Sequence, residues 1–185
     1  DYQEEAINAW VNNDYHGFYV MATGTGKTWT AIFSAKHLVE KHPAMIVICA
    51  PYKHLVKQWA DDVEKAFPDA KLIMVSSENP IWETQIAQEI IRKQYKPDNQ
   101  IIIISTIASF KMERFTSVIS RSKEDKLLIV DEAHRFTDRP DKLKEMFQYM
   151  LGLSATPFSG SSAHKGFELM EWFGGQVFNL PIENA

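Results

Sequence analysis

The stretch Met21-Ala-Thr-Gly-Thr-Gly-Lys-Thr28 lies between a short apolar run, residues 17–21, and a helix-like segment, residues 29–39. This order predicts a strand, a glycine-containing loop and the start of a helix. Glycines let successive backbone N–H groups turn toward an anion, and a helix N-terminus adds unpaired donors and a dipole. The stretch therefore predicts a phosphate-binding loop. Its expected ligand-contacting residues are Thr23, Gly24, Thr25, Gly26, Lys27 and Thr28.

Lys27 and Thr28 carry the side-chain chemistry of this loop. Lys27 is expected to lie against the outer phosphates of a nucleotide, and the Thr28 hydroxyl is expected to ligate Mg²⁺. The strict loop pattern has glycine five residues before Gly26, where this chain has Met21. A plain strand-to-helix turn could also contain two glycines. Such a turn gives no reason for a cation at the start of a helix, where it opposes the helix dipole, so nucleotide binding is preferred.

The composition is that of an ordinary globular protein. Of the 185 residues, 45% are hydrophobic and 24% are charged, and the formal net charge is -4. An acidic total argues against a protein coated in basic residues, so a nucleic-acid partner would be held by a local groove. The single cysteine, Cys49, excludes an intrachain disulfide, and the six histidines show no metal-ligand spacing, so no zinc is expected. No apolar run approaches bilayer length, so we expect a cytoplasmic protein with no membrane partner.

Apolar runs alternate with helical patterns along the chain, and no internal repeat or linker divides residues 1–185. The expected strands are residues 17–21, 45–50, 71–75, 101–104, 127–130 and 151–154. The expected helices are residues 1–11, 29–39, 55–67, one begun by Asn79-Pro80, 107–119, one from about Asp141 to Met150, and a last one before residues 176–180. Strands that are apolar on both faces predict a single α/β domain, with a mainly parallel sheet and helices on both faces. Right-handed crossovers would place the strand-to-helix loops at one carboxyl edge, where such folds bind ligands.

Two acidic residues follow the expected strand at residues 127–130. Asp131 can hold Mg²⁺ through its water shell, opposite Thr28. Glu132 could orient the water that attacks the γ-phosphate, or accept its proton. Lys27, Asp131 and Glu132 are therefore the candidate catalytic residues, although two acids after a buried strand could merely cap the following helix.

His134 follows the two acids, and a lone histidine is more often a structural residue than a functional one. It becomes a candidate here because Ser154 and Thr156 end a neighbouring expected strand. Their hydroxyls could form hydrogen bonds with the imidazole.

Three motifs occur in the order seen in superfamily II helicases and translocases: Ala22-Thr-Gly-Thr-Gly-Lys-Thr28, Asp131-Glu-Ala-His134 and Leu153-Ser-Ala-Thr-Pro157. The chain resembles this family over nearly its whole length. The resemblance implies the first of the family's two RecA-like motor domains, which is a three-layer P-loop NTPase fold. Members of the family lack the first glycine of the strict loop pattern, so Met21 agrees with the resemblance. The motif forms are most similar to restriction-enzyme motor subunits and repair or remodelling translocases, which favours DNA over RNA.

The resemblance also implies roles for residues outside the phosphate loop. Tyr2-Gln3 resembles the motif whose glutamine reads adenine, and a glutamine amide can pair with both N6 and N7 of that base. Gln3 could instead be an exposed helical residue. In the family, the segments matching Ala50-Pro51-Tyr52-Lys53 and Ser105-Thr106 contact the nucleic-acid backbone. Backbone amides and hydroxyls suit such contacts, so Pro51, Tyr52 and Thr106 are candidates, although each could be an ordinary loop residue. The family's motif coupling ATP to strand movement resembles Ser154-Ala155-Thr156, with His134 as its partner.

The function implied by the resemblance is Mg²⁺-dependent ATP hydrolysis coupled to movement on DNA, with RNA as the other possible track. The family's second lobe supplies an arginine finger, and nothing after Leu153 offers a second phosphate loop. The chain alone is therefore expected to bind ATP and Mg²⁺ but to hydrolyse ATP poorly. One alternative is a P-loop kinase or AAA-type ATPase, which leaves the Ser-Ala-Thr-Pro segment unexplained. Another is a non-catalytic lobe that acts as a nucleic-acid clamp or scaffold.

Overall fold

The computed structural model describes residues 1–138, 141–155 and 163–181 of the chain. Its strands are β1 (His16–Met21), β2 (Met45–Ala50), β3 (Lys71–Val75), β4 (Ile101–Thr106), β5 (Lys126–Val130), β6 (Tyr149–Ser154) and β7 (Gln176–Leu180). Its helices are α1 (Tyr2–Asn12), α2 (Lys27–Lys41), α3 (Lys53–Ala66), α4 (Trp82–Tyr95), α5 (Ile107–Phe110), α6 (Glu113–Ile119), the 3₁₀ turn η1 (Ala133–Arg135), α7 (Asp141–Lys144) and α8 (Ala163–Phe173).

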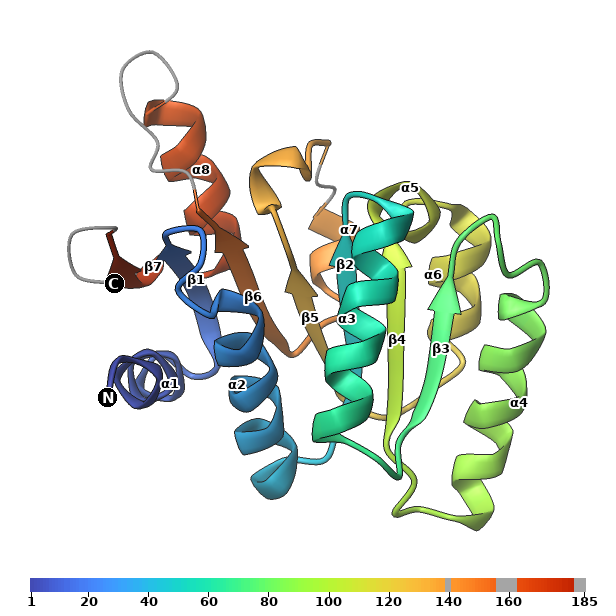
Figure 1. The fold of residues 1–185 in the computed structure, drawn as a ribbon. Helices are drawn as coiled ribbons and strands as arrows, with labels where there is room; N and C mark the ends of the chain where they lie inside the picture. The colour runs from blue at the N-terminus through green and yellow to red at the C-terminus, as the bar shows by residue number, and fades with distance from the viewer. Residues whose placement is uncertain (139–140, 156–162, 182–185) are drawn as a thin grey trace.

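The described strands form one seven-stranded sheet in the order β3-β4-β2-β5-β6-β1-β7. Each neighbouring pair is parallel, and the arrows in Figure 1 point the same way. The carboxyl ends of the strands therefore meet at one edge, as the alternation of strands and helices predicted. This confirms the α/β fold with a parallel sheet.

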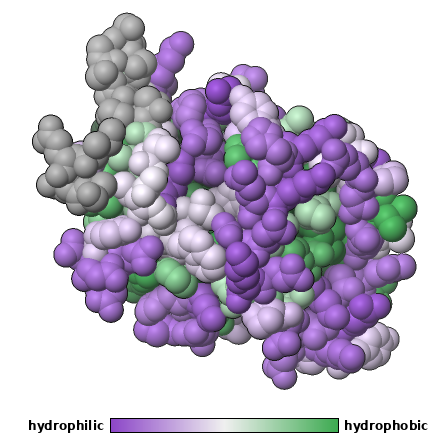
Figure 2. Space-filling model, in the orientation of Figure 1, coloured by the Kyte–Doolittle hydropathy of each residue, from purple (hydrophilic) through white to green (hydrophobic). Residues whose placement is uncertain are grey.

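Helices cover both faces of the sheet, and the two faces form two separate cores. Leu127 and Ile129 of β5 belong to the core under α1, α2 and α3, while Leu128 and Val130 belong to the core under α4 to α8. This division follows from the alternation of side chains along a strand, and it explains why the central strands are apolar throughout. Figure 1 shows α2 and α3 crossing in front of the sheet, and Figure 2 shows that the outer surface on this side is mostly hydrophilic. No helix of the described ranges has the length and apolar character needed to cross a bilayer.

The expected single helix at residues 107–119 is wrong, because the structure has two short helices separated by Lys111-Met112. Phe110 and Phe115 pack together in the same core, with ring centroids 5.3 Å apart. Five positions on one continuous helix would turn these rings about 140° away from each other, given 3.6 residues per turn. The break lets both rings enter the core.

The helix expected from Asp141 to Met150 is also shorter than the pattern suggested. α7 ends at Lys144, and Met150 lies in β6, between Leu128 of β5 and His16 of β1. Periodicity alone does not separate a short apolar run in a helix from one in a buried strand.

The predicted start of α4 needs correction as well. The helix does not begin at Asn79-Pro80, because its first residue is Trp82 and its N-cap position is Ile81. The Asn79 amide instead donates to the Met74 carbonyl at 2.7 Å and to Gln85 Oε1 at 2.8 Å.

Candidate functional site

The phosphate loop follows β1 at the carboxyl edge of the sheet, and α2 begins within it at Lys27. Gly24 has φ +82° and Gly26 has φ +77°, conformations that a side chain would strain. The backbone N–H groups of Thr23, Gly24 and Gly26 have no hydrogen-bond partner among residues 1–138, 141–155 and 163–181. The loop therefore offers unpaired donors at the start of a helix, which is the arrangement that suits an anion.

Thr25 differs from the other residues of the loop, because its donors are already used. Its hydroxyl donates to the Ala22 carbonyl at 2.6 Å, and its backbone N–H points to the same oxygen at 3.2 Å. The side chain is buried inside the turn. Thr25 therefore holds the shape of the loop, and a bound anion would compete with Ala22 for its donors.

Tyr2 and Gln3 lie beside the loop, although they come from α1. The Tyr2 hydroxyl donates to the Thr25 carbonyl at 2.7 Å. A Cβ atom placed on Gly26 would be 3.6 Å from Gln3 Nε2. Gln3 is thus within reach of a ligand in the loop, and Tyr2 is a supporting residue that the sequence pattern did not single out.

Lys27 joins the phosphate loop to the two acids that follow β5. Its Nζ lies 2.7 Å from Glu132 Oε1 and 3.5 Å from Asp131 Oδ1. The Lys27 and Asp131 side chains are 13% and 7% exposed, so the cluster is largely shielded from water. The parallel sheet brings these groups together across 105 residues of sequence.

Glu132 adopts a backbone conformation that is unusual for a residue with a side chain, with φ +47°. Strain of this kind costs on the order of 1–2 kcal/mol and clusters at functional sites. The residue precedes η1 but makes no side-chain hydrogen bond to its N–H groups, so this acid does not act as a helix cap. The unusual backbone instead accompanies a carboxylate that reaches Lys27.

Asp131 is held from three directions at the end of β5. Its backbone N–H donates to the Cys49 carbonyl of β2 at 2.8 Å. Its Oδ1 accepts the Glu132 backbone N–H at 2.9 Å, and its Oδ2 accepts the indole N–H of Trp59 at 2.9 Å. Trp59 lies within the helix expected at residues 55–67, and the sequence pattern gave no sign of this polar contact.

His134 lies between the acid pair and the end of β6. Its Nδ1 is 3.3 Å from Ser154 Oγ and 3.6 Å from Glu132 Oε2. Ser154 is fully buried. The expected contact of His134 with a hydroxyl at the end of a neighbouring strand is thus present for Ser154, whereas Thr156 lies outside the described residues.

The three residues expected to contact nucleic acid share one hollow of about 480 Å³ at the carboxyl edge. Its lining residues are Pro51, Tyr52, Lys53, Ser77, Thr106, Ala108, Ser109 and Met112. The Thr106 hydroxyl accepts the Ser109 backbone N–H at 3.2 Å and so caps α5. The Arg135 guanidinium lies 5.3 Å from the centre of the Tyr52 ring, which places the end of η1 beside this hollow.

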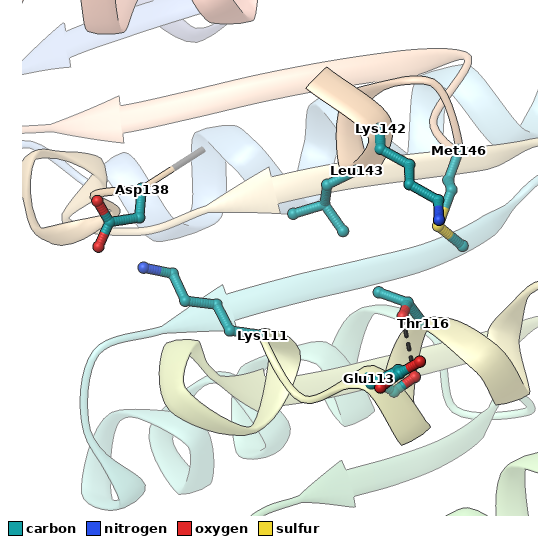
Figure 3. Close-up of a pocket in the computed structure, with 7 residues that line it drawn as sticks. All are labelled: Lys111, Glu113, Thr116, Asp138, Lys142, Leu143 and Met146. Atoms are coloured by element: carbon teal, nitrogen blue, oxygen red, sulfur yellow. Dashed lines mark hydrogen bonds between the residues drawn. The ribbon is translucent and has the colours of Figure 1, made fainter. Parts of the chain in front are cut away.

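A second hollow, of about 380 Å³, lies between the α5–α6 junction and the chain that follows β5 (Figure 3). Its lining residues are Lys111, Glu113, Thr116, Asp138, Lys142, Leu143 and Met146. Lys111 also donates to the Thr137 carbonyl and lies 5.4 Å from the centre of the Phe136 ring. The sequence pattern predicted no site here, and none of these lining residues is a predicted site residue.

The groups at the nucleotide edge fit a hard divalent cation. Mg²⁺ prefers oxygen ligands, keeps several waters, and is usually bound by one or two protein groups together with substrate phosphates. The Asp131 carboxylate and the Thr28 hydroxyl are ligands of that kind. The Thr28 hydroxyl has no hydrogen-bond partner among the residues that the structure describes. Within the same residues, no three His, Cys, Asp or Glu side chains gather as a metal cluster.

Comparison with known proteins identifies the family of the chain. Residues 1–159 match the family model described as "Type III restriction enzyme, res subunit". The chain is 29% identical over 163 residues to "Putative helicase 109L" of Invertebrate iridescent virus 3, which covers 86% of this chain and 44% of that protein. The chain thus spans less than half the length of this curated relative.

Solved structures share the fold at low sequence identity. A nuclease-deletion mutant of the Type ISP restriction-modification enzyme LlaGI, in complex with a DNA substrate mimic, has a TM-score of 0.79 at 20% identity, covering 98% of this chain and 20% of that one. The Hef helicase domain of Pyrococcus furiosus has a TM-score of 0.70 at 23% identity, covering 100% and 38%. The Sulfolobus solfataricus SWI2/SNF2 ATPase core, in complex with double-stranded DNA, has a TM-score of 0.62 at 19% identity, covering 94% and 35%. The chain therefore belongs to the family of the type III restriction enzyme res subunit and has the fold of the first RecA-like domain of superfamily II helicases.

Proposed function

We propose that this chain is the ATP-binding lobe of a nucleic-acid motor, which hydrolyses ATP with Mg²⁺ and uses the energy to move along DNA. The observation that carries the proposal is the convergence of Lys27 with Asp131 and Glu132 beside a glycine loop. Three N–H groups of this loop have no partner among the described residues. A triphosphate needs cationic and N–H donors, and its magnesium ion needs oxygen ligands. Both are supplied at this one edge.

Each residue has a separate task in the proposed reaction. Thr28 and Asp131 would hold Mg²⁺, which when bound neutralises charge on the phosphates. Lys27 would contact the outer phosphates, and Glu132 would orient the attacking water and take up its proton. Phosphoryl transfer asks for little covalent chemistry from the protein, so placing these groups correctly accounts for most of the catalysis.

The hollow beside α3 and α5 is the proposed contact with the nucleic-acid backbone. Tyr52 and Lys53 stand at the start of α3, and backbone phosphates can be held by N–H groups, hydroxyls and helix starts without reading sequence. The Thr106 hydroxyl accepts a bond from Ser109, which leaves its own proton available for a phosphate oxygen. DNA is favoured because the LlaGI and SWI2/SNF2 structures of the same fold are DNA complexes.

Replacing Lys27 tests the nucleotide site. Lys27→Ala should weaken ATP binding by about 10- to 100-fold, because a hydrogen bond to a charged group contributes roughly 1.5–3 kcal/mol. The unpaired acids left behind would also repel the phosphates. Calorimetry in the presence of Mg²⁺ measures the change, and Lys36→Ala, which removes an exposed lysine of the same helix, is the control. Undiminished affinity in Lys27→Ala would exclude the proposed loop.

Replacing Glu132 tests catalysis in the full-length protein. Glu132→Gln should retain ATP binding but reduce nucleic-acid-stimulated ATP turnover by about 10²- to 10⁴-fold, the usual contribution of a general base. Glu64→Gln, on the exposed side of α3, should leave turnover unchanged. If the unsubstituted full-length protein binds nucleic acid and shows no ATP turnover, the lobe acts as a clamp or scaffold instead.

A further inference from the structure

Trp59 contacts the nucleotide edge from inside the core. It lies on α3 and is 2% exposed, among the apolar residues that fill the space between α3 and the sheet. Its ring is large enough to cross that layer, and its one polar atom emerges beside Asp131. The indole Nε1 donates to Asp131 Oδ2 at 2.9 Å.

The contact assigns different neighbours to the two oxygens of the Asp131 carboxylate. Oδ2 accepts the indole N–H. Oδ1 accepts the Glu132 N–H and lies 3.5 Å from Lys27 Nζ, so it faces the phosphate loop. Turning the carboxylate plane about χ2 out of this orientation would break both hydrogen bonds, whereas a half-turn only exchanges two equivalent oxygens. The indole thus holds the orientation in which Oδ1 faces the nucleotide edge.

An indole is well suited to this task because it donates one hydrogen bond and carries no charge. A lysine or arginine in its place would neutralise the carboxylate and compete with a cation for it. The rigid ring is itself fixed by the surrounding core, so the donor stays in position when the carboxylate changes partners. Groups that orient a metal ligand in this way typically change metal affinity by about 10- to 100-fold when they are removed.

We propose that Trp59 is a positioning residue for the magnesium ligand Asp131. Its indole N–H holds Oδ2, so that Oδ1 is presented to the cation bound with the nucleotide. The inference rests on the proposed function of the site, and it adds a residue from the helix that begins at the nucleic-acid hollow.

The test measures how Mg²⁺ changes the affinity of a fluorescent ADP analogue. Trp59→Phe keeps the ring in the core and removes only the donor. The Mg²⁺ concentration that gives half of the affinity gain should rise about tenfold in this variant, while affinity measured in EDTA stays that of the unsubstituted chain. The matched control is Trp10→Phe, because Trp10 is also fully buried in the same core and also donates its indole N–H at 2.9 Å, to the Met150 carbonyl.

The comparison separates positioning from a merely structural contribution. A structural role predicts that both variants lose stability to urea and keep the Mg²⁺ midpoint of the unsubstituted chain, and that result would overturn the proposal. If the unsubstituted chain binds the analogue equally with and without Mg²⁺, the proposed function itself fails as well. If Mg²⁺ raises the affinity of the unsubstituted chain for the analogue but Trp59→Phe has the same Mg²⁺ midpoint, only the role of Trp59 is rejected.

A second measurement needs no substitution at Trp59. In ¹⁵N-labelled chain with saturating ADP analogue, adding Mg²⁺ should shift the indole N–H resonance of Trp59, identified by triple-resonance assignment, and leave that of Trp10 in place. A Trp59 resonance that stays fixed during this titration contradicts the inference even if Trp59→Phe does not fold.

Discussion

Gly152 lies in the middle of β6, where its backbone is paired with Phe18 of β1. A Cβ atom at this position would come 2.4 Å from the Phe18 ring and 3.0 Å from the ring of Phe173. Gly152→Ala should therefore lower the free energy of unfolding by about 1–3 kcal/mol, as overpacking of a close-packed core does. Urea unfolding followed by circular dichroism measures the loss.

Gly24→Ala should also destabilise the chain, but for a different reason from Gly152→Ala. No atom lies within 4 Å of a Cβ placed on Gly24, so any cost there comes from its φ of +82° and not from a collision. That cost is roughly 1–2 kcal/mol, and it affects the phosphate loop and not the core.

If the Gly152→Ala chain resists urea as well as the unsubstituted chain does, the Phe18 ring can move aside and the overpacking prediction is wrong.

The candidate roles of single residues could be predicted where they depend on the residue type and on its position relative to the expected strands and helices. Asp131 and Glu132 were predicted because they directly follow an expected buried strand, and Lys27 because it ends a glycine loop at the start of an expected helix. The parallel sheet brings the three side chains together. Trp59 and Tyr2 were not assigned their contacts, because each presents one polar atom at the end of a mostly apolar side chain. Their partners are 72 and 23 residues away in sequence, so only the folded chain reveals the contact.

The side chain of Tyr19 links three elements. Tyr19 lies on β1, and its hydroxyl donates to the Ala6 carbonyl of α1 at 3.1 Å. The same hydroxyl forms a hydrogen bond with Ser34 Oγ of α2 at 2.9 Å. Burial raises the pKa of this phenol well above its ordinary 10.0, and the bond to Ser34 lowers it by less. Tyr19→Phe should cost about 1 kcal/mol at pH 7, the usual value of a buried hydrogen bond. Because Tyr19 ionises more readily in the unfolded chain, its contribution is complete below pH 10 and is lost as the pH rises above that value.

Urea unfolding from pH 7 to pH 11 measures this change. The stability difference between the unsubstituted chain and Tyr19→Phe should shrink above pH 10, whereas Tyr95→Phe, which alters an 81% exposed side chain, should show no difference at any pH. A Tyr19→Phe difference that stays constant over the whole range would mean that the phenol is not held by these elements.

Elements were predicted well where a long apolar run or a strong helical period marks them, as in β2, β4 and α3. The errors fall on short segments. Residues 107–119 contain a helical period interrupted by a break that only core packing requires, and residues 141–150 change from helix to strand within one apolar run. The local pattern does not show which strand such residues will pair with. Their secondary structure is therefore decided by pairing and packing in the folded chain.

At the scale of the whole molecule, the chain carries one phosphate loop among its described residues, and the family resemblance implies that an arginine from a second lobe completes the ATP site. The chain of 185 residues should therefore bind Mg²⁺ and ATP but turn ATP over far more slowly than the full-length protein, since such an arginine contributes about 10³–10⁵ in rate. Phosphate release with and without DNA, measured on both proteins at equal concentration, tests this. Rapid DNA-stimulated turnover by the short chain would show that one lobe is sufficient.

The position of β1 between β6 and β7 has a consequence for biosynthesis. β1 is translated well before its two neighbours in the sheet, which begin at Tyr149 and Gln176. Pairing between such distant segments must wait until the ribosome has released the chain through β6 and β7. The loop that follows β1 is thus made long before the two strands that support β1 on either side. A nascent chain arrested before Tyr149 would carry the loop's complete sequence with neither flanking strand to support it.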